Sequence, residues 1–256
     1  MIQLQLLGSG SQGNSTYVSN GNGEAILVDA GFSAKEINYR LKQAKIDPFS
    51  IKNILITHEH TDHIRGAKTL AKNIGAQICL NQKTYEKVEN ILGNSKLHIF
   101  ENGKEFDLGS IGVEPFSIEH DAVDPVGFVF QSSSVKVGFV TDLGTVTDNV
   151  RSKVSDLNYL ILEANHDLEM LFAGSYPWFL KQRIASKVGH LSNEEAVELL
   201  ISTATDKLEG VTFSHLSKEN NSKELLELIV MKSLNGKELK FDIASQDEAG
   251  RLQVIG

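Results

Sequence analysis

Short apolar runs rich in Ile, Val, Leu and Phe recur along the chain, separated by Gly and Asn residues. Runs of this length, bounded by turn-forming residues, predict β-strands. We expect strands at residues 3–7, 25–28, 53–56, 77–80, 111–118, 126–130, 135–140, 159–162 and 211–213. Segments 14–28 and 126–140 are expected to form hairpins.

Helical spacing of apolar residues appears between some of these strands. It predicts helices at 34–44, 67–72, 83–91, 176–188, 193–202 and 223–231. Ser33 with Glu36, and Ser192 with Glu195, have the Ser-x-x-Glu spacing of a capping box, in which hydroxyl and carboxylate each bind a free amide at a helix start. The pattern is that of a strand-rich α/β protein.

The composition indicates one folded domain. Apolar residues make up 41% of the 256 positions, enough for a full core, and Pro-rich linkers and repeats are absent from the sequence. We therefore expect a single domain over 1–256. Cys79 is the only cysteine, which excludes an internal disulfide framework and a thiolate zinc cluster, predicts no disulfide-linked partner and fits a reducing compartment.

The charge and hydropathy of the chain restrict the kinds of partner that the protein is expected to bind. The segment 1–14 lacks a basic region followed by a sustained apolar stretch, and no run approaches the roughly 18 apolar residues of a membrane span. We expect a soluble, cytoplasmic protein that does not bind a membrane. The net charge of −8 disfavours a uniformly basic face that wraps nucleic acid, although a local basic patch is compatible with it.

Five predicted strands run directly into a polar residue that can bind a metal or carry a proton. A strand that reaches solvent also ends in a polar residue, so one such case means little. In layered α/β folds, however, strand ends gather along one rim, and five together indicate a site. These residues are Asp29, His58, Asp142, Glu163 and His215.

The strongest motif is His-Glu-His-Thr-Asp-His at 58–63, directly after a predicted buried strand. Imidazole and carboxylate suit zinc and comparable divalent ions, and this loop offers four such groups in six residues. An exposed polar loop is the alternative, but solvent loops do not favour clustered histidines. His58 and His60 can grip one ion, while Asp62 and His63 can face a second ion. His120, Asp142 and His215, which each follow a predicted strand, are the remaining candidate ligands.

His-x-His-x-Asp-His is the signature of the metallo-β-lactamase fold superfamily, which this sequence resembles over nearly its whole length. The resemblance implies an αββα sandwich, two mixed sheets flanked by helices. It implies that one metal is held by His58, His60 and His120, and the other by Asp62, His63 and His215. Asp142 would bridge the two ions. Asp29 would orient the metal loop without touching metal.

Within this superfamily, segments 7–15, 163–167, 189–196 and 214–221 resemble the YycJ and WalJ group, bacterial phosphodiesterases described as 5′ to 3′ exonucleases on DNA. The Gly-His-Leu-Ser segment at 189–192 is also similar to a helix start in transfer-RNA 3′-processing ribonucleases. Both resemblances imply phosphodiester chemistry.

That chemistry assigns roles to three further groups. Two divalent ions generate a hydroxide nucleophile and stabilise the charge on the phosphate. Asp62 can accept a proton from the attacking water, and His190 is the candidate proton donor to the leaving oxygen, with Glu163 orienting it. A capping or packing role for His190 is the alternative interpretation.

Substrate contacts are expected from several polar residues around this motif. The loop 8–14 can offer amides and hydroxyls to a phosphate, although tight turns use the same residues, and a cap at a helix start is the alternative for Asn221. A cationic run with nearby aromatics at 176–187 is compatible with stacked bases or with an ordinary amphipathic helix. His98 is expected to be structural. The candidate substrate contacts are Ser11, Asn14, His166, Lys181, Arg183 and Asn221.

The sequence therefore predicts a dinuclear phosphodiesterase acting as a DNA exonuclease at a strand end. Zinc or manganese are the expected ions, and iron and nickel also suit these ligands. An RNA-processing ribonuclease, a hydrolase of small esters, thioesters or lactams, and an iron-holding redox scaffold are the alternatives. Two divalent ions would add positive charge where the phosphate approaches, whereas the net negative charge of the protein argues against long contact with the backbone. We therefore expect the protein to contact a short stretch at the strand end, with an affinity for DNA that weakens as salt concentration rises.

Overall fold

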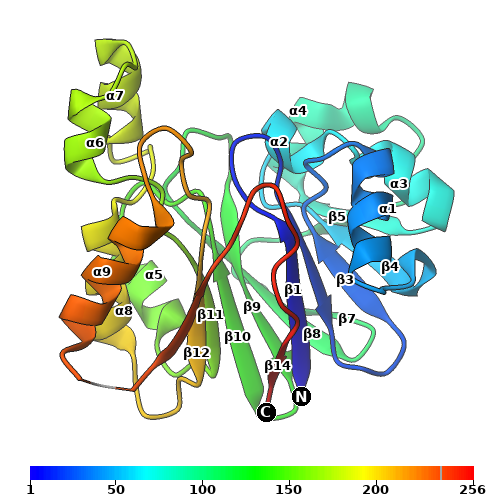
Figure 1. The fold of residues 1–256 in the computed structure, drawn as a ribbon. Coiled ribbons are helices and arrows are strands. Elements are labelled where there is room, and N and C mark those ends of the chain that lie inside the picture. Colours follow the sequence, from blue (N-terminus) through cyan, green and yellow to red (C-terminus); the bar gives the residue numbers. More distant parts are fainter. Residues whose placement is uncertain (237) are drawn as a thin grey trace.

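Two mixed β-sheets pack face to face in the computed structural model, which describes residues 1–236 and 238–256 (Figure 1). Helices cover the outer face of each sheet, so the layers follow the order α, β, β, α. This is the predicted fold class.

The first sheet joins the N-terminal third of the chain to its last strand. Strands β3 to β6 are parallel, whereas β14, β1 and β2 pair antiparallel. In order across the sheet, the strands are β14 (Gln253–Ile255), β1 (Ile2–Gly8), β2 (Ser15–Ser19), β3 (Ala25–Val28), β4 (Ile51–Leu55), β5 (Gln77–Asn81) and β6 (Leu97–Phe100).

The second sheet has the same division. Strands β10 to β13 are parallel, whereas β7, β8 and β9 pair antiparallel. Its order is β13 (Lys240–Ile243), β12 (Gly210–Ser214), β11 (Tyr159–Glu163), β10 (Val135–Val140), β9 (Val126–Ser132), β8 (Ile111–Ser117) and β7 (Phe106–Leu108).

The helices segregate by sheet. The first sheet carries α1 (Ala34–Gln43), a short 3-10 turn at Pro48–Ser50, α2 (Thr61–Ile64), α3 (Ala67–Ile74) and α4 (Gln82–Leu92). The second carries α5 (Asp148–Val154), α6 (Leu168–Ala173), α7 (Trp178–Ile184), α8 (Asn193–Thr203) and α9 (Lys223–Leu234). Among the described residues, no helix combines the length and apolarity needed to cross a membrane.

Three apolar clusters hold the four layers together, one between the two sheets and one between each sheet and its helices. Alternate residues of β3 point to opposite faces: Ile26 and Val28 join the cluster between the sheets, and Ala25 and Leu27 join the cluster under α1, α3 and α4. In β9, Phe128 lies between the sheets while Val129 packs toward α5 and α8. Because both faces of these strands are buried, their sequences read as continuous apolar runs.

The predicted hairpins form, since β2 pairs with β3 and β9 with β10 in antiparallel register. The helix expected over 176–188 is wrong in length, because α7 ends at Ile184. The chain then turns, with the Gly189 amide donating to the Ser186 carbonyl and the His190 amide to that of Ile184. A side chain at Gly189 would collide with the Ile184 carbonyl, so glycine is required at this turn.

Candidate active site

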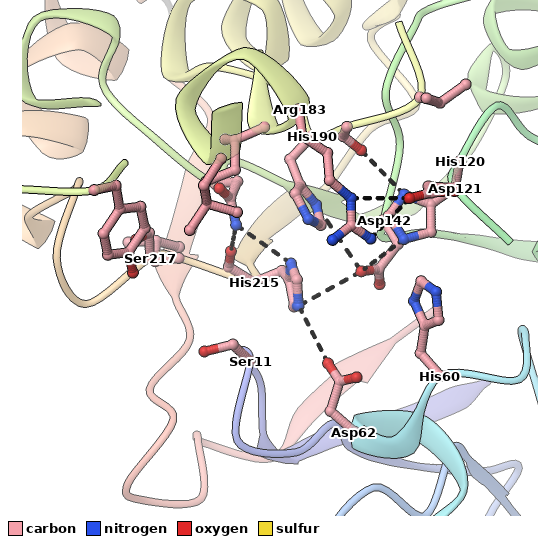
Figure 2. Close-up of a pocket in the computed structure, with 17 residues that line it drawn as sticks. Ser11, His60, Asp62, His120, Asp121, Asp142, Arg183, His190, His215 and Ser217 are labelled. Carbon is pink, nitrogen blue, oxygen red and sulfur yellow. Dashed lines mark hydrogen bonds and ion pairs between the residues drawn. The ribbon is translucent and has the colours of Figure 1, made fainter. Parts of the chain in front are cut away.

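Polar side chains from both sheets meet at one rim of the sandwich (Figure 2). Asp29 and His215 directly follow the parallel strands β3 and β12, Asp142 lies two residues after the end of β10, and each of the three adopts a left-handed backbone with φ near +58°. Non-glycine residues rarely adopt this conformation, which concentrates where a fold over-determines a functional position. The carboxyl ends of the strands thus deliver these side chains to one place.

The metal loop lies between β4 and α2. His60 caps α2, and Asp62 and His63 lie in its first turn. Backbone hydrogen bonds hold the loop to its neighbours: the Asn14 amide donates to the Asp62 carbonyl, and the Ala30 amide to the His63 carbonyl. The loops after β1, β3 and β4 therefore form one rigid unit.

The first group of candidate ligands consists of His58, His60 and His120, whose nitrogens lie within 4.8 Å of one another. His120 Nδ1 lies 3.0 Å from the Gly189 carbonyl oxygen, which can only accept, so Nδ1 carries the proton and Nε2 is left for a ligand. His58 Nε2 and His60 Nδ1 face each other at 2.9 Å.

The second group consists of Asp62, His63 and His215, again within 4.8 Å. His63 Nδ1 donates to Asp29 Oδ2 at 2.7 Å, which turns Nε2 toward Asp62. Burial lowers the pKa of His63, but Asp29 and Asp142 outweigh it and raise the pKa well above its ordinary value.

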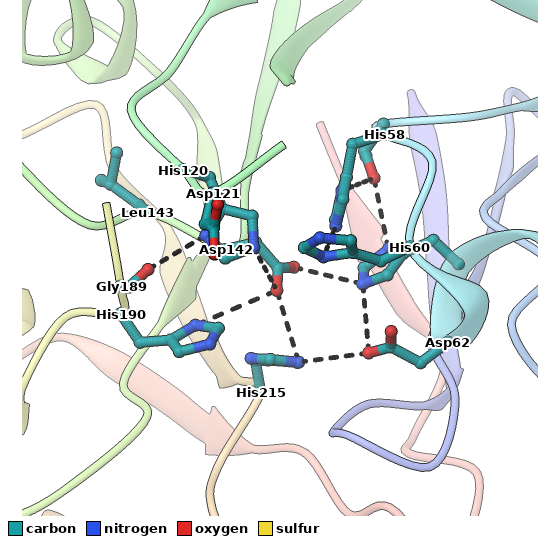
Figure 3. Close-up of polar contacts among 12 residues, drawn as sticks. His58, His60, Asp62, His120, Asp121, Asp142, Leu143, Gly189, His190 and His215 are labelled. Atoms are coloured by element: carbon teal, nitrogen blue, oxygen red, sulfur yellow. Dashed lines mark hydrogen bonds and ion pairs between the residues drawn. The ribbon is translucent and has the colours of Figure 1, made fainter. Parts of the chain in front are cut away.

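Asp142 lies between the two groups (Figure 3). Its Oδ2 is 3.4 Å from His63 Nε2, and its Oδ1 is 3.5 Å from His215 Nε2 and 3.8 Å from His120 Nε2. Burial raises the pKa of Asp142, but the surrounding histidines lower it well below its usual value, His215 most strongly. Asp142 therefore stays ionised, as a bridging ligand must.

Both carboxylate oxygens of Asp29 contact Thr57, the residue before the His motif. Its Oδ1 accepts from the Thr57 amide at 2.9 Å, and its Oδ2 lies 2.9 Å from the Thr57 hydroxyl. That hydroxyl also lies 3.0 Å from His58 Nδ1. The sequence analysis missed Thr57, whose only signal is its position directly before the His motif.

The residues present fit a pair of divalent ions. Asp142 Oδ2 and His215 Nε2 are buried with no hydrogen-bond partner among the described residues, which is costly for polar atoms unless something else engages them. Facing imidazole nitrogens, as at His58 and His60, point to the same explanation. Nitrogen and oxygen donors of this kind suit zinc, manganese, iron and nickel.

His190 lies beside this cluster with a buried carboxylate behind it. Its Nδ1 shares a hydrogen bond with Glu163 Oε1 at 2.9 Å, which leaves Nε2 for the pocket. Glu163 also accepts from the amides of Leu143 and Leu191. Burial raises the pKa of Glu163 to about 8 and lowers that of His190. Glu163 therefore contacts His190 directly, which the predicted orienting role requires.

A cavity of about 280 Å³ opens over the cluster. Ser11, Arg183 and Asp121 line it together with five of the candidate ligands: His60, Asp62, His120, Asp142 and His215. Arg183 pairs with Asp121 at 2.8 Å, and both side chains are more than half exposed. Of the six expected substrate contacts, Ser11 and Arg183 are therefore the two that face this cavity.

Three of the other expected contacts are corrected by the structure, because their polar atoms are used inside the protein. Asn14 accepts from the Gly10 amide, and its Nδ2 lies 3.1 Å from His63 Nε2. Asn221 donates to the Ala164 and Asn165 carbonyls. Lys181 is 7% exposed, and its ammonium donates to the carbonyls of Phe172 and Gly174.

His166 is buried as well, and it lines no part of the cavity. The analysis missed Asn165, whose Nδ2 donates to the His215 carbonyl and lies 3.4 Å from His215 Nδ1. Its signal was the Glu-Ala-Asn-His-Asp segment directly after β11. His98 lies in β6 with its ring 5.1 Å from that of Phe106, away from the cluster.

The profile of the beta-lactamase superfamily domain matches residues 24–209, well over half of the chain. This chain belongs to the beta-lactamase superfamily. The match confirms the resemblance drawn from the His motif.

Two curated relatives of this superfamily member cover most of its length. It is 42% identical to Exodeoxyribonuclease WalJ of Streptococcus pneumoniae serotype 2 (strain D39 / NCTC 7466), over 91% of this chain and 88% of that protein. It is 38% identical to Exodeoxyribonuclease YycJ of Bacillus anthracis, over 92% and 90%. The metallo-beta-lactamase fold protein YhfI from Bacillus subtilis has the same fold, with a TM-score of 0.75, 15% identity and coverage of 100% and 99%.

Proposed function

We propose that this protein is a phosphodiesterase dependent on two divalent metal ions that degrades DNA from a strand end, in the 5′ to 3′ direction. The observation that carries the proposal is the pairing of His190 with buried Glu163 beside the cluster of seven candidate ligands, five of which line the same cavity as His190. The relatives named exodeoxyribonucleases support DNA as the substrate.

The candidate ligands form two groups, each of which would hold one ion. His58, His60 and His120 would hold one ion and Asp62, His63 and His215 the other, with Asp142 between them. Bound there, the ions would supply Lewis acidity, which makes water nucleophilic near neutral pH and offsets phosphate charge.

Side chains of the protein accept and donate the protons that the reaction transfers. Burial raises the pKa of Asp62, but hydrogen bonding and charge from His63 hold it below its usual value, so Asp62 is an ionised acceptor for the proton of the attacking water. His190 donates a proton from Nε2 to the departing sugar oxygen, and the proton that Nδ1 shares with Glu163 keeps the imidazole neutral afterwards. Arg183 and Ser11 face the strand at the mouth of the cavity.

The test compares His58→Ala and Asp142→Ala with His98→Ala, a histidine outside the cluster. Metal content of the purified proteins is measured first, followed by digestion of 5′- and 3′-labelled single-stranded and duplex DNA and RNA. We expect the first two variants to lose metal and cleavage, and His98→Ala to keep both. Cleavage of no polymer by the wild type, with turnover of a thioester or lactam, would contradict the proposal, and preferred cleavage of RNA would replace DNA as the substrate.

A further inference from the structure

Residues 168–188 form a projection at the rim of the sandwich, made of α6, α7 and the turn after α7 (Figure 1). We call it the α6–α7 projection. Among the described residues, it contributes no member to the three apolar clusters of the core. Its buried side chains are Leu171 and Lys181. Packing of the sandwich therefore does not account for the apolar residues in this segment.

Three aromatic side chains of the projection are exposed to solvent. Phe172 is 44% exposed, Trp178 61% and Phe179 72%. The rings of Phe172 and Trp178 lie 5.8 Å apart and are tilted by 48°. Contiguous exposed aromatics on a protein surface mark an interaction site.

Internal hydrogen bonds hold these rings in place. The Lys181 ammonium donates to the carbonyls of Phe172 and Gly174, which ties α7 to the end of α6. The Asp167 carboxylate caps the start of α6 by accepting from the Met170 amide at 2.8 Å. The aromatic face is therefore pre-organised, which lowers the entropic cost of binding.

The same projection forms one wall of the active-site cavity. Tyr176, Leu180, Arg183 and Ile184 line the cavity together with His190, whereas the three exposed aromatics lie outside its lining (Figure 2). The exposed aromatics therefore lie on the segment that borders the cavity, within reach of a strand whose end occupies it.

The charge of the projection favours a phosphate strand. Its exposed cations are Arg183 and Lys187 and its one acid is Glu169, in a protein whose net charge is −8, while buried Lys181 is engaged by backbone carbonyls. Exposed aromatic side chains with cations close by are the pattern with which proteins bind single strands, because bases stack on the rings and phosphates meet the cations.

We propose that Phe172, Trp178 and Phe179 stack on unpaired bases of a DNA strand whose end lies in the cavity, so that this face sets the preference for single-stranded DNA. The inference rests on the proposed function. Paired bases cannot stack on these rings, so a duplex must fray before it binds here.

Trp178 provides a direct probe, because it is the only tryptophan in the chain. The holoenzyme is titrated with a short oligothymidylate whose terminal phosphorothioate linkages resist cleavage, and with an abasic strand of equal length. We expect the oligothymidylate to quench Trp178 emission and the abasic strand to leave it nearly unchanged. Equal quenching by both strands, or none by either, would overturn the inference. A blue shift that follows protein concentration alone would identify a second copy of this chain as the occupant, and would also overturn it.

Kinetics of Trp178→Ala, Phe179→Ala and Trp178→Phe give the second readout. We expect the two alanine variants to raise KM for single-stranded DNA about five- to tenfold, and Trp178→Phe to restore most of the affinity. Phe49→Ala is the matched control, since Phe49 is 62% exposed beside α1, far from the projection in the fold.

The two proposals fail separately. If the wild type cleaves DNA and Trp178→Ala has an unchanged KM, the stacking inference is wrong and the nuclease proposal stands. If the wild type cleaves no DNA, the nuclease proposal is wrong.

Discussion

The ring of His190 lies between a buried carboxylate and the open cavity. Glu163 is fully buried, and its pKa is raised to about 8, while burial lowers the pKa of His190. A carboxyl whose pKa is raised, next to an imidazole whose pKa is lowered, can share one proton with it near neutral pH, so the pair can hold and release that proton. The sequence named both residues, but their 2.9 Å contact depends on the tertiary structure.

A proton donor matters most when the leaving group is a strong base. We expect His190→Gln to slow cleavage of DNA by about 10²- to 10⁴-fold, while cleavage of bis(p-nitrophenyl) phosphate, whose leaving group departs as a stable anion, falls far less. Initial rates on both substrates measure the difference, with Glu163→Gln expected to follow the same trend. Equal losses on the two substrates would show that His190 does not donate this proton.

His166 is a second residue whose buried environment shifts its pKa, and this shift makes the stability of the protein depend on pH. It is 1% exposed, and neither ring nitrogen has a hydrogen-bond partner among the described residues. Burial lowers its pKa to about 4, against about 6.5 in the unfolded chain. Between these values the unfolded state binds more protons, so the stability contributed by neutral His166 is lost as pH falls from about 6.5 toward 4.

Replacement by an apolar residue removes this dependence. When pH falls from 7 to 5, we expect the wild type to lose about 2 kcal/mol more of its free energy of unfolding than His166→Leu loses. Urea denaturation at the two pH values measures this change. A difference between the proteins that stays constant with pH would mean that His166 is not held neutral in the folded state.

At the scale of elements, the two Ser-x-x-Glu motifs behave differently. At α8, Ser192 Oγ accepts from the Glu195 amide while the Glu195 carboxylate accepts from the Ser192 amide, so the capping box is complete. At α1, Ser33 accepts from the Glu36 amide, but the Glu36 carboxylate pairs with Arg40 at 2.7 Å. The sequence expectation of a reciprocal contact is therefore wrong at α1.

This difference predicts unequal stability effects. We expect Ser192→Ala, at a fully buried cap, to lower the free energy of unfolding by about 1–2 kcal/mol, and Ser33→Ala, at an exposed cap, by about 0.5 kcal/mol. Denaturant melts of the two variants beside the wild type provide the comparison. Equal losses would assign the stability to the hydroxyl bond alone rather than to the complete box.

Most predicted elements form because their apolar pattern follows the core. The sequence analysis named no strand at 97–100, 106–108, 240–243 or 253–255, and no helix at 148–154 or 168–173. The four missed strands are three or four residues long, and each lies at an edge of its sheet, so they carry little periodic signal. α6 has one buried residue, Leu171, which leaves no apolar stripe to detect.

For the whole molecule, the candidate ligands concentrate buried charge at the rim that joins the two sheets. His58, His120 and His190 have pKa values lowered by burial, while Asp142 stays ionised among them. Divalent ions that bind only the folded protein would stabilise it by mass action.

Metal removal should therefore affect stability as well as activity. At metal concentrations about a hundredfold above Kd, we expect the melting temperature to exceed that of the chelated protein by about 5–10 °C. Thermal melts with EDTA, and after addition of Mn²⁺ or Zn²⁺, measure this shift. Asp142→Asn is expected to lose the shift and His98→Asn to keep it, and an unchanged melting temperature in wild type would contradict a paired metal site.

The sequence by itself determined the strands that read as short apolar runs, the two hairpins, and the acids and histidines at strand ends, because these features depend on a few neighbouring residues. The tertiary structure decided which atoms meet. It placed Asp142 between two ligand groups, put Glu163 behind His190, and turned Lys181 and Asn221 inward to bind backbone carbonyls. Such contacts join residues far apart in the chain, and they depend on strand register and sheet packing, which local spacing does not encode.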